Sequence, residues 1–163
     1  MKVLGVVIQN NFSMQEHVAS MCRSAAQSLY ALQLFKVHGM DFQSLCTVCK
    51  ALVVAKLTYA STAWWGFATN ENRQSLQAVL NRATRRGFYK SSDLSIEQHC
   101  RARDLKLFSS VLHNPSHVLH HLLPPPTTHT HNLRPRGHNR QLPIHNSTLN
   151  SKNFLSRMLY QTI

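Results

Sequence analysis

The first forty residues contain a short run of β-branched residues, followed by a long segment whose apolar residues have helical spacing. Residues 2–8 are rich in Val, which predicts a strand buried on at least one face, with no predicted partner strand. Ser13 and Glu16 then stand at the spacing of a capping box, which predicts that a helix begins there. Gly39 is expected to end this helix. Its apolar residues recur at three- and four-residue steps, at Val18, Met21, Cys22, Ala25, Leu29 and Leu32.

A second helix is predicted near 42–60, where Asp41 is placed to cap its first turn. The aromatic segment 59–67 is expected to finish this helix, to end at Gly66 and to pack on the core. The apolar stripe of the second helix consists of Leu45, Val48, Cys49, Leu52, Val53 and Leu57.

Two further helices follow the same spacing. The third spans about 70–88 and begins at Thr69 or Asn70. The fourth follows Ser95 and ends before Pro115, because proline disfavours helical geometry in the preceding residue. The apolar side of the third helix is formed by Leu76, Val79, Leu80 and Ala83.

The C-terminal part of the chain has a different character. Residues 124–147 contain five of the six prolines and no acid, and eight of the eleven histidines fall in 113–145, which indicates an extended segment. Residues 154–160 predict a short amphipathic helix. The sequence therefore predicts a mainly α fold: a helical bundle of about four helices with one short N-terminal strand and an extended Pro/His-rich C-terminal segment.

Charge narrows the choice of partner. The 163 residues contain 18 Lys and Arg against 6 acids, a net charge of +12 with every His neutral, so we expect an anionic partner. No apolar run approaches the roughly 18 residues that a membrane helix needs, so we expect no membrane partner. The short apolar start argues against a secretory signal, and four cysteines are expected to be reduced thiols. An intracellular protein is expected, with nucleus and cytoplasm left open.

The third predicted helix carries three arginines within five residues, and no acid lies between Glu71 and Asp93. At 100° per residue the arginines lie on an arc beside the apolar side. Such a positive field attracts phosphates, and the alternative is a solvated basic face on a basic protein. Similar basic groups follow on the fourth helix and in the tail. The candidate nucleic-acid contacts are Arg82, Arg85, Arg86, Lys90, Arg101, Arg103, Lys106, Arg134, Arg136 and Arg140.

Other patterns that can carry chemistry are weaker. Cys46 and Cys49 have the C-x-x-C spacing of zinc or redox pairs, but no second pair stands at a standard spacing, and Cys49 falls on an apolar stripe. The clustered histidines have no nearby carboxylate to orient them. We therefore expect neither a metal nor a cofactor. Asp93 and Glu97 are the only acids at i,i+4 spacing and are interpreted as an idle surface pair.

The tryptophans of the second predicted helix also allow two interpretations. Trp64 and Trp65 could stack on nucleic-acid bases. Because they stand beside Tyr59 and Phe67, we interpret them as core or interface residues instead.

Several short motifs follow one another in an order typical of one protein family. They are Val3-Leu4-Gly5-Val6, Phe12-Ser13-Met14 with His17, Leu29-Tyr30-Ala31-Leu32, Tyr59-Ala60-Ser61 with Trp64, Leu76-Gln77, Asn81-Arg82-Ala83 with Arg86, His113-Asn114-Pro115, His120-His121-Leu122-Leu123-Pro124 and Asn132-Leu133-Arg134. Their order over about 150 residues resembles the C-terminal portion of the reverse transcriptase of a non-LTR retrotransposon, of the LINE type related to jockey elements.

This resemblance implies a thumb and post-thumb region, in which helices hold a template–primer duplex through its phosphates. It implies a remnant strand at 1–12 that follows the polymerase palm, a thumb-like domain at 13–123 and a tail at 124–163. The family's catalytic Phe/Tyr-Ala-Asp-Asp motif is absent, and no adjacent Asp pair occurs anywhere in the chain. Since two-metal nucleotidyl transfer needs carboxylates, we expect no enzymatic activity from this chain alone.

The function expected from these observations is sequence-tolerant binding of RNA or DNA through the phosphate backbone. The missing palm domain or a full-length reverse transcriptase is a further expected partner. Two alternatives stay open: a metal-binding or protein-interaction module that uses the Cys and His residues, and the translation of a truncated repeat with no selected function.

Overall fold

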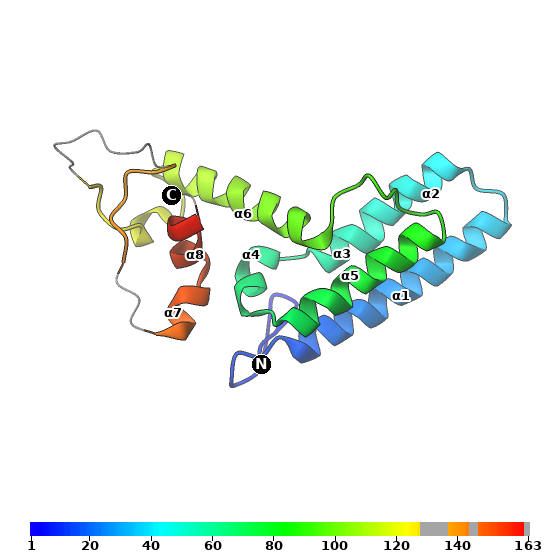
Figure 1. Ribbon diagram of the computed structural model, residues 1–163, viewed down its shortest axis with the longest axis horizontal. Helices are drawn as coiled ribbons and strands as arrows, with labels where there is room; N and C mark the ends of the chain where they lie inside the picture. Colours follow the sequence, from blue (N-terminus) through cyan, green and yellow to red (C-terminus); the bar gives the residue numbers. More distant parts are fainter. Residues whose placement is uncertain (128–136, 144–146, 162–163) are drawn as a thin grey trace. The chain divides into compact units, whose positions relative to one another are not determined.

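The computed structural model describes residues 1–127, 137–143 and 147–161 and confirms a mainly α fold (Figure 1). The chain forms two compact units, Met1–Cys100 and Arg101–Ile163, called here the first and the second unit. The division falls inside a helix that the sequence predicts correctly, whereas the sequence-based division placed a boundary after residue 123.

The N-terminal run is a hairpin and not the single strand that was expected. Strands β1 (Lys2–Val3) and β2 (Val6–Val7) pair antiparallel. Leu4 and Gly5 between them have φ angles of 46° and 88°, as a tight two-residue hairpin turn requires. The prediction failed because Leu4 is not a typical residue for a left-handed turn position, so nothing in the run marks the reversal.

Helix α1 (Gln15–Val37) buries the predicted stripe except for Cys22, which is half-buried, and its start differs from the prediction. The N-cap is Met14, and the Ser13 hydroxyl accepts a hydrogen bond from the backbone N–H of Gln15 at 3.3 Å. The expected capping box is therefore wrong, because Ser13 stands one residue outside the helix. The end is as predicted: Gly39 has a φ of 89°, and the next N–H donates to the Phe35 carbonyl at 3.0 Å.

The second predicted helix is one continuous helical segment, called here the rod, that contains a π-helical turn. Helix α2 (Phe42–Cys49) runs into the π-helical turn η1 (Lys50–Val54) and then into α3 (Ala55–Leu57). Asp41 caps the rod as predicted, accepting from the N–H of Ser44 at 3.0 Å. The π turn rotates the chain so that Leu52, expected in the apolar stripe, is 47% exposed instead.

The rod ends at Leu57, so the prediction of one helix through the aromatic segment is wrong. Ala60 adopts a left-handed conformation with φ of 48°, after which α4 (Ser61–Trp64) and the 3-10 turn η2 (Trp65–Phe67) follow. The Trp64 indole N–H donates to the Tyr59 carbonyl at 2.8 Å, which satisfies a backbone group freed by the break. Trp64 and Trp65 are both buried, so they belong to the core.

By length and composition alone, the stretch Phe42–Phe67 could cross a membrane. However, 44% of its most apolar window is buried inside the protein. The left-handed residue Ala60 also interrupts its helical geometry. The stretch is therefore not one continuous helix.

Helix α5 (Asn70–Arg85) completes the core of the first unit, and Thr69 caps it by accepting from the Asn72 N–H at 3.3 Å. It packs on α1, and its predicted apolar side is fully buried. Helix α6 (Ile96–His113) follows a reciprocal capping box in which Ser95 and Gln98 each accept from the other's N–H, at 3.3 and 2.7 Å.

The second unit has short helices and a small core. After α6 come the 3-10 turn η3 (His120–Leu122), α7 (Thr148–Lys152) and α8 (Phe154–Gln161), of which α8 is the predicted C-terminal helix. Its buried apolar residues, among those that the structure describes, are Phe108, Val111, Met158 and Leu159. Part of the tail is paired rather than simply extended, since an isolated bridge joins Pro126 to Arg140.

Candidate nucleic-acid interface

The three arginines of α5 are all exposed, but they do not form one surface. Arg82 and Arg85 each lie along the helix, with Nε donating to the carbonyl four residues earlier at 3.3 and 3.4 Å. None of the three has an acidic partner among the described residues. Their charges are therefore available to a ligand.

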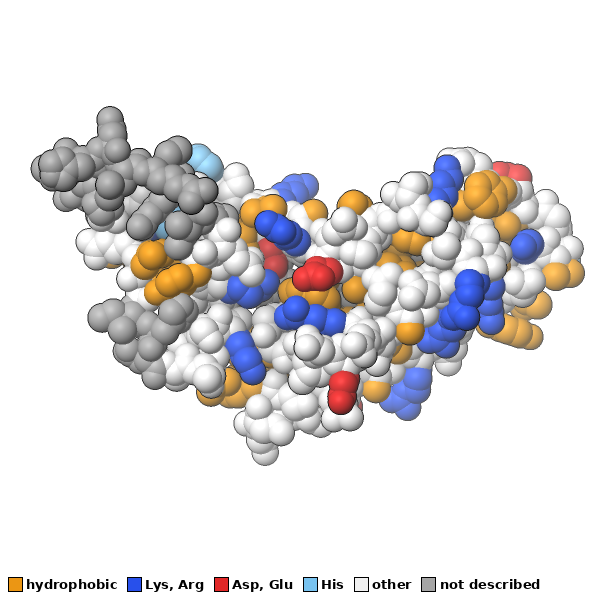
Figure 2. Space-filling model, in the orientation of Figure 1, with side chains coloured by type: hydrophobic (Ala, Val, Ile, Leu, Met, Phe, Trp, Pro, Cys, Tyr) orange, Lys and Arg blue, Asp and Glu red, His pale blue; other side chains and the backbone are white. Residues whose placement is uncertain are grey.

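Arg82 and Arg86 lie on the α1 side of α5. Arg86 Nη1 approaches the Leu29 carbonyl at 3.5 Å, and Lys36 Nζ donates to the Arg86 carbonyl at 3.3 Å. Arg82 is close enough to Cys22 to oppose the rise that burial causes in the pKa of that thiol. Lys36 thus joins Arg82 and Arg86, and we call these three residues the basic edge of α5. The sequence alone could not predict that Lys36 belongs to this edge, because fifty positions separate it from Arg86. Figure 2 shows basic side chains gathered over the C-terminal parts of α5 and α1.

Arg85 faces a different neighbourhood, a polar groove of about 740 Å³ in the first unit. The groove lies between the C-terminal half of α5, the loop after it and the first turn of α6, and Lys90 lines it together with Arg85. The other polar groups on its walls are amides and hydroxyls, from Gln77, Asn81, Thr84, Ser91, Ser95 and Gln98. Such groups commonly hydrogen-bond to phosphate and sugar oxygens.

Buried anchors hold the loop that carries Lys90. Phe88 is fully buried, and the Tyr89 hydroxyl donates to the Leu94 carbonyl at 2.6 Å and contacts His99 Nε2 at 2.9 Å. Burial, with smaller contributions from Asp93 and Cys49, raises the pKa of Tyr89 to about 12, so this phenol stays protonated. The loop therefore presents Lys90 from a fixed backbone.

The single acid that lines the polar groove is already paired. Asp93 accepts from Lys50 Nζ at 2.9 Å and from the Lys90 backbone N–H at 3.2 Å, and the Lys50 hydrogen bond is the main cause that lowers the pKa of Asp93. Asp93 lies before α6 and not on it, so the helical i,i+4 pair with Glu97 does not exist. With Asp93 neutralised by Lys50, the groove keeps the positive charges of Arg85 and Lys90.

The basic candidates of the second unit have mixed surroundings. Arg101, Arg103 and Lys106 are exposed on α6. Arg140 is half-buried, and its Nη1 donates to the Pro124 carbonyl at 3.2 Å, which supports the Pro126–Arg140 bridge. The candidates Arg134 and Arg136 lie outside the described residues.

The cysteine pair is part of the core. Cys46 and Cys49 are buried free thiols, and burial is the main cause that raises the pKa of Cys49 to about 11. A thiol with such a pKa is a poor source of the thiolate that binds zinc or attacks a disulfide. Across residues 1–127, 137–143 and 147–161, no three His, Cys, Asp or Glu side chains gather as a metal site would require.

No family model, curated protein or solved structure that was compared with the chain matches it. The fold and the surface together therefore define its class: a mainly α protein with a basic helical edge and a basic polar groove in its first unit.

Proposed function

We propose that this chain is a helical module that binds the phosphate backbone of RNA or DNA without sequence preference, and that it does not polymerise nucleotides by itself. The observation that carries the proposal is the polar groove, where Arg85 and Lys90 stand among neutral donors and the only carboxylate is neutralised by Lys50. The proposed role agrees with the resemblance to a reverse-transcriptase thumb, which is part of the same proposal.

The chemistry of the groove suits the oxygens of a phosphate backbone. A guanidinium offers two parallel N–H donors to two phosphate oxygens, and a lysine adds a compact charge that can follow the next phosphate. None of the groove's side chains is aromatic apart from Tyr89, whose hydroxyl is engaged with Leu94 and His99. Base stacking therefore contributes little, and binding should tolerate any sequence.

The acids of the chain support the absence of catalysis. Asp93 is paired with Lys50, and the buried Asp104 is paired with Arg157 at 2.7 Å. The remaining four acids are exposed and belong to four different elements, and no three His, Cys, Asp or Glu side chains gather in the part of the chain that the structure describes, which supports the absence of two-metal nucleotidyl transfer. DNA synthesis by the pure chain on a primed template would contradict this part of the proposal.

The binding part is tested with a fluorescent 20-base-pair RNA–DNA hybrid and its DNA counterpart, titrated between about 50 and 200 mM salt. Because bound phosphates release counterions, the logarithm of affinity should fall linearly with the logarithm of salt concentration. The double variant Arg85→Gln with Lys90→Gln should bind more weakly and should reduce this slope by about two.

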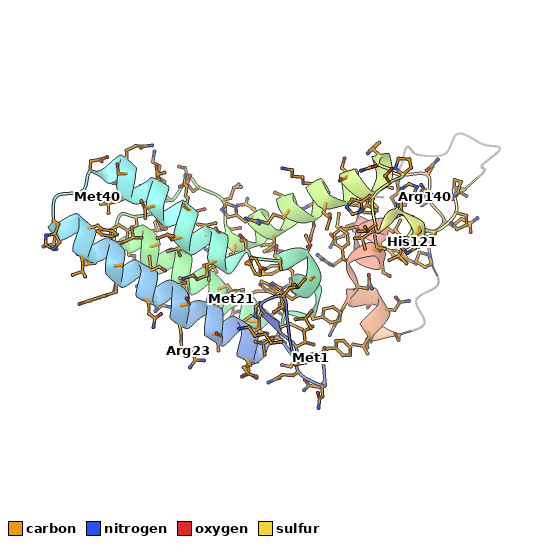
Figure 3. All side chains as sticks on the ribbon, turned by 180° about the vertical axis from the view of Figure 1, so that it is seen from behind. Met1, Met21, Arg23, Met40, His121 and Arg140 are labelled. Atoms are coloured by element: carbon orange, nitrogen blue, oxygen red, sulfur yellow. The ribbon has the colours of Figure 1, made fainter. Side chains whose placement is uncertain are left out.

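The matched control is Arg23→Gln with Lys152→Gln, which removes the same net charge from exposed side chains outside the groove. Arg23 points away from the bundle (Figure 3). The control should leave the salt slope nearly unchanged. Equal losses in both double variants would mean that net charge alone attracts the nucleic acid, and the groove would then have no role.

A further inference from the structure

A second groove of about 550 Å³ lies in the first unit, away from the residues proposed to bind phosphate. Helix α1 contributes Met21, the rod of the second helix contributes Leu52 and Ala55, and the N-terminal hairpin contributes Val7. Figure 3 shows Met21 on α1 beside the hairpin that carries Met1. Most of the exposed lining is apolar, so we call this the apolar groove.

The π turn and the hairpin build the groove. The wide turn at Lys50–Val54 places Leu52 on the groove wall and out of the core, and π turns inside α-helices are frequently found at functional sites. The Tyr59 hydroxyl donates to the Leu4 carbonyl at 3.1 Å, which holds the hairpin in place. Gly5 suits the turn of the hairpin because its φ is 88°, whereas a Cβ there would only make an ordinary contact of 3.4 Å with the Tyr59 ring.

The charge of the groove is positive and uncompensated. Lys2 and Lys56 line it, and no carboxylate does. Lys56 Nζ donates to the Ser24 carbonyl at 3.4 Å and to the Ser28 hydroxyl at 3.2 Å, both of them neutral partners. A half-buried ammonium with only neutral partners favours an anion beside it.

A buried histidine, His17, is also among the residues that line the groove. His17 is 3% exposed, and its Nδ1 accepts from the Val7 N–H at 3.4 Å. The proton of the neutral ring is therefore on Nε2, which has no hydrogen-bond partner among the described residues. The ring packs edge-on against Trp64, with 5.4 Å between the ring centroids, and Nε2 is inaccessible, so the head group is assigned to the lysines and not to this histidine.

We propose that the apolar groove binds a small amphipathic carboxylate, with an unbranched apolar chain against Met21, Leu52 and Ala55 and the carboxylate beside Lys56. The volume lies in the range of about 300–1,000 Å³ that is usual for small-molecule sites. Charge complementarity selects the head group, and the apolar lining selects the tail. This site is independent of the nucleic-acid interface.

The test compares three ligands that share a ten-carbon chain: decanoate, decanol and decyltrimethylammonium, each below its micelle concentration and followed by amide NMR of the full chain. Decanoate should shift the amides of Gly5, Leu52 and Ala55 saturably, and decyltrimethylammonium should bind about tenfold more weakly. Equal affinity for all three, or no saturable shift at these amides, would overturn the proposal.

Two variants separate the head group from the tail. Lys56→Gln should weaken decanoate about tenfold without changing decanol, whereas Arg23→Gln, on α1 and not among the residues that line the groove, should change neither. Leu52→Glu replaces an exposed side chain and should repel decanoate while the α5 amides keep their positions. Decanoate binding that survives both Lys56→Gln and Leu52→Glu would place the ligand elsewhere. If a helical peptide, and none of the three ligands, binds here, the proposed class of ligand is wrong.

Discussion

The two units of the chain are stabilised by different kinds of contact. The first unit has a continuous apolar core in which Trp64, Phe88 and Leu29 are almost fully buried, and most of its Lys and Arg side chains are exposed. Among its described residues the second unit buries only four apolar side chains, those of Phe108, Val111, Met158 and Leu159, and it adds an internal ion pair between Asp104 and Arg157. The first unit should therefore tolerate polar substitutions on its surface, whereas the second depends on a few specific polar contacts.

Polar contacts to backbone carbonyls reinforce the second unit further. His138 is buried with a ring nitrogen 2.8 Å from the Leu159 carbonyl, and the Tyr160 hydroxyl donates to the Pro143 carbonyl at 2.6 Å. Each contact links α8 to the tail before it. Since both tryptophans belong to the first unit, tryptophan fluorescence reports on that unit and far-ultraviolet circular dichroism reports on both.

The largest expected effect comes from breaking the ion pair. Asp104→Ala leaves the Arg157 charge buried without its partner, which costs about 3–5 kcal/mol. We expect loss of helical circular dichroism and rapid amide exchange in α8 under conditions where tryptophan fluorescence is still native. The double variant Asp104→Leu with Arg157→Met should recover much of the loss. A tryptophan transition that moves as far as the dichroism would contradict the separation of the units.

A core truncation in the first unit should give the opposite pattern. Leu29→Ala removes a side chain that is 2% exposed, and such cavities cost about 2–5 kcal/mol. Tryptophan fluorescence and dichroism in urea should both move to lower denaturant, whereas α8 exchange should change little. Val37→Ala, at a position 74% exposed on the same helix, is the control and should have almost no effect.

Acidification should destabilise the first unit through His17. Burial lowers the pKa of His17, so the unfolded chain binds its proton more readily than the folded one. This contribution to stability is present above the unfolded pKa of about 6.5 and is lost as the pH falls toward the folded value, by at most about 1.4 kcal/mol per pH unit. Urea unfolding followed by tryptophan fluorescence from pH 7.5 to 5 should show this decline. In His17→Phe the decline should be shallower; identical slopes would exclude His17 as its source.

The smallest expected effect is at the surface ion pair of the first unit. Lys50→Gln removes the partner of Asp93, and exposed pairs of this kind contribute about 0.2–1 kcal/mol. The same change leaves the Asp93 carboxylate uncompensated in the polar groove, so affinity for the RNA–DNA hybrid should fall even though stability hardly changes. An unchanged affinity would mean that the ligand does not approach Asp93.

The helices whose apolar spacing is regular were predictable from the sequence. The stripes of α1 and α5 and the cap at Asp41 are as expected. The π turn was not predictable, because the adjacent residues Val53 and Val54 are equally compatible with a regular α-helix. The break at Ala60 was missed for a related reason. No Gly or Pro marks it, and the contact that compensates it, from the Trp64 indole to the Tyr59 carbonyl, exists only after folding.

The candidate site shows the same limit. Periodicity placed the arginines of α5 on an arc, but it could not divide them between the α1 edge and the polar groove. That division depends on Lys36 and on the loop anchored by Tyr89, which come from other parts of the chain. The pairing of Asp104 with Arg157 could not be predicted from the sequence either, because fifty-three positions separate the two residues.

The π turn also makes the second rod unusually tolerant of shortening. Such a turn accommodates one residue more than a regular helix of the same span, and its flanks keep their orientation. Deleting Leu52 should therefore restore regular i→i−4 bonding and leave Cys49 and Leu57 facing inward. A deletion elsewhere in a helix would rotate everything after it by about 100°. Deletion of this one residue would therefore remove a wall of the apolar groove and leave the rest of the helical segment folded as before.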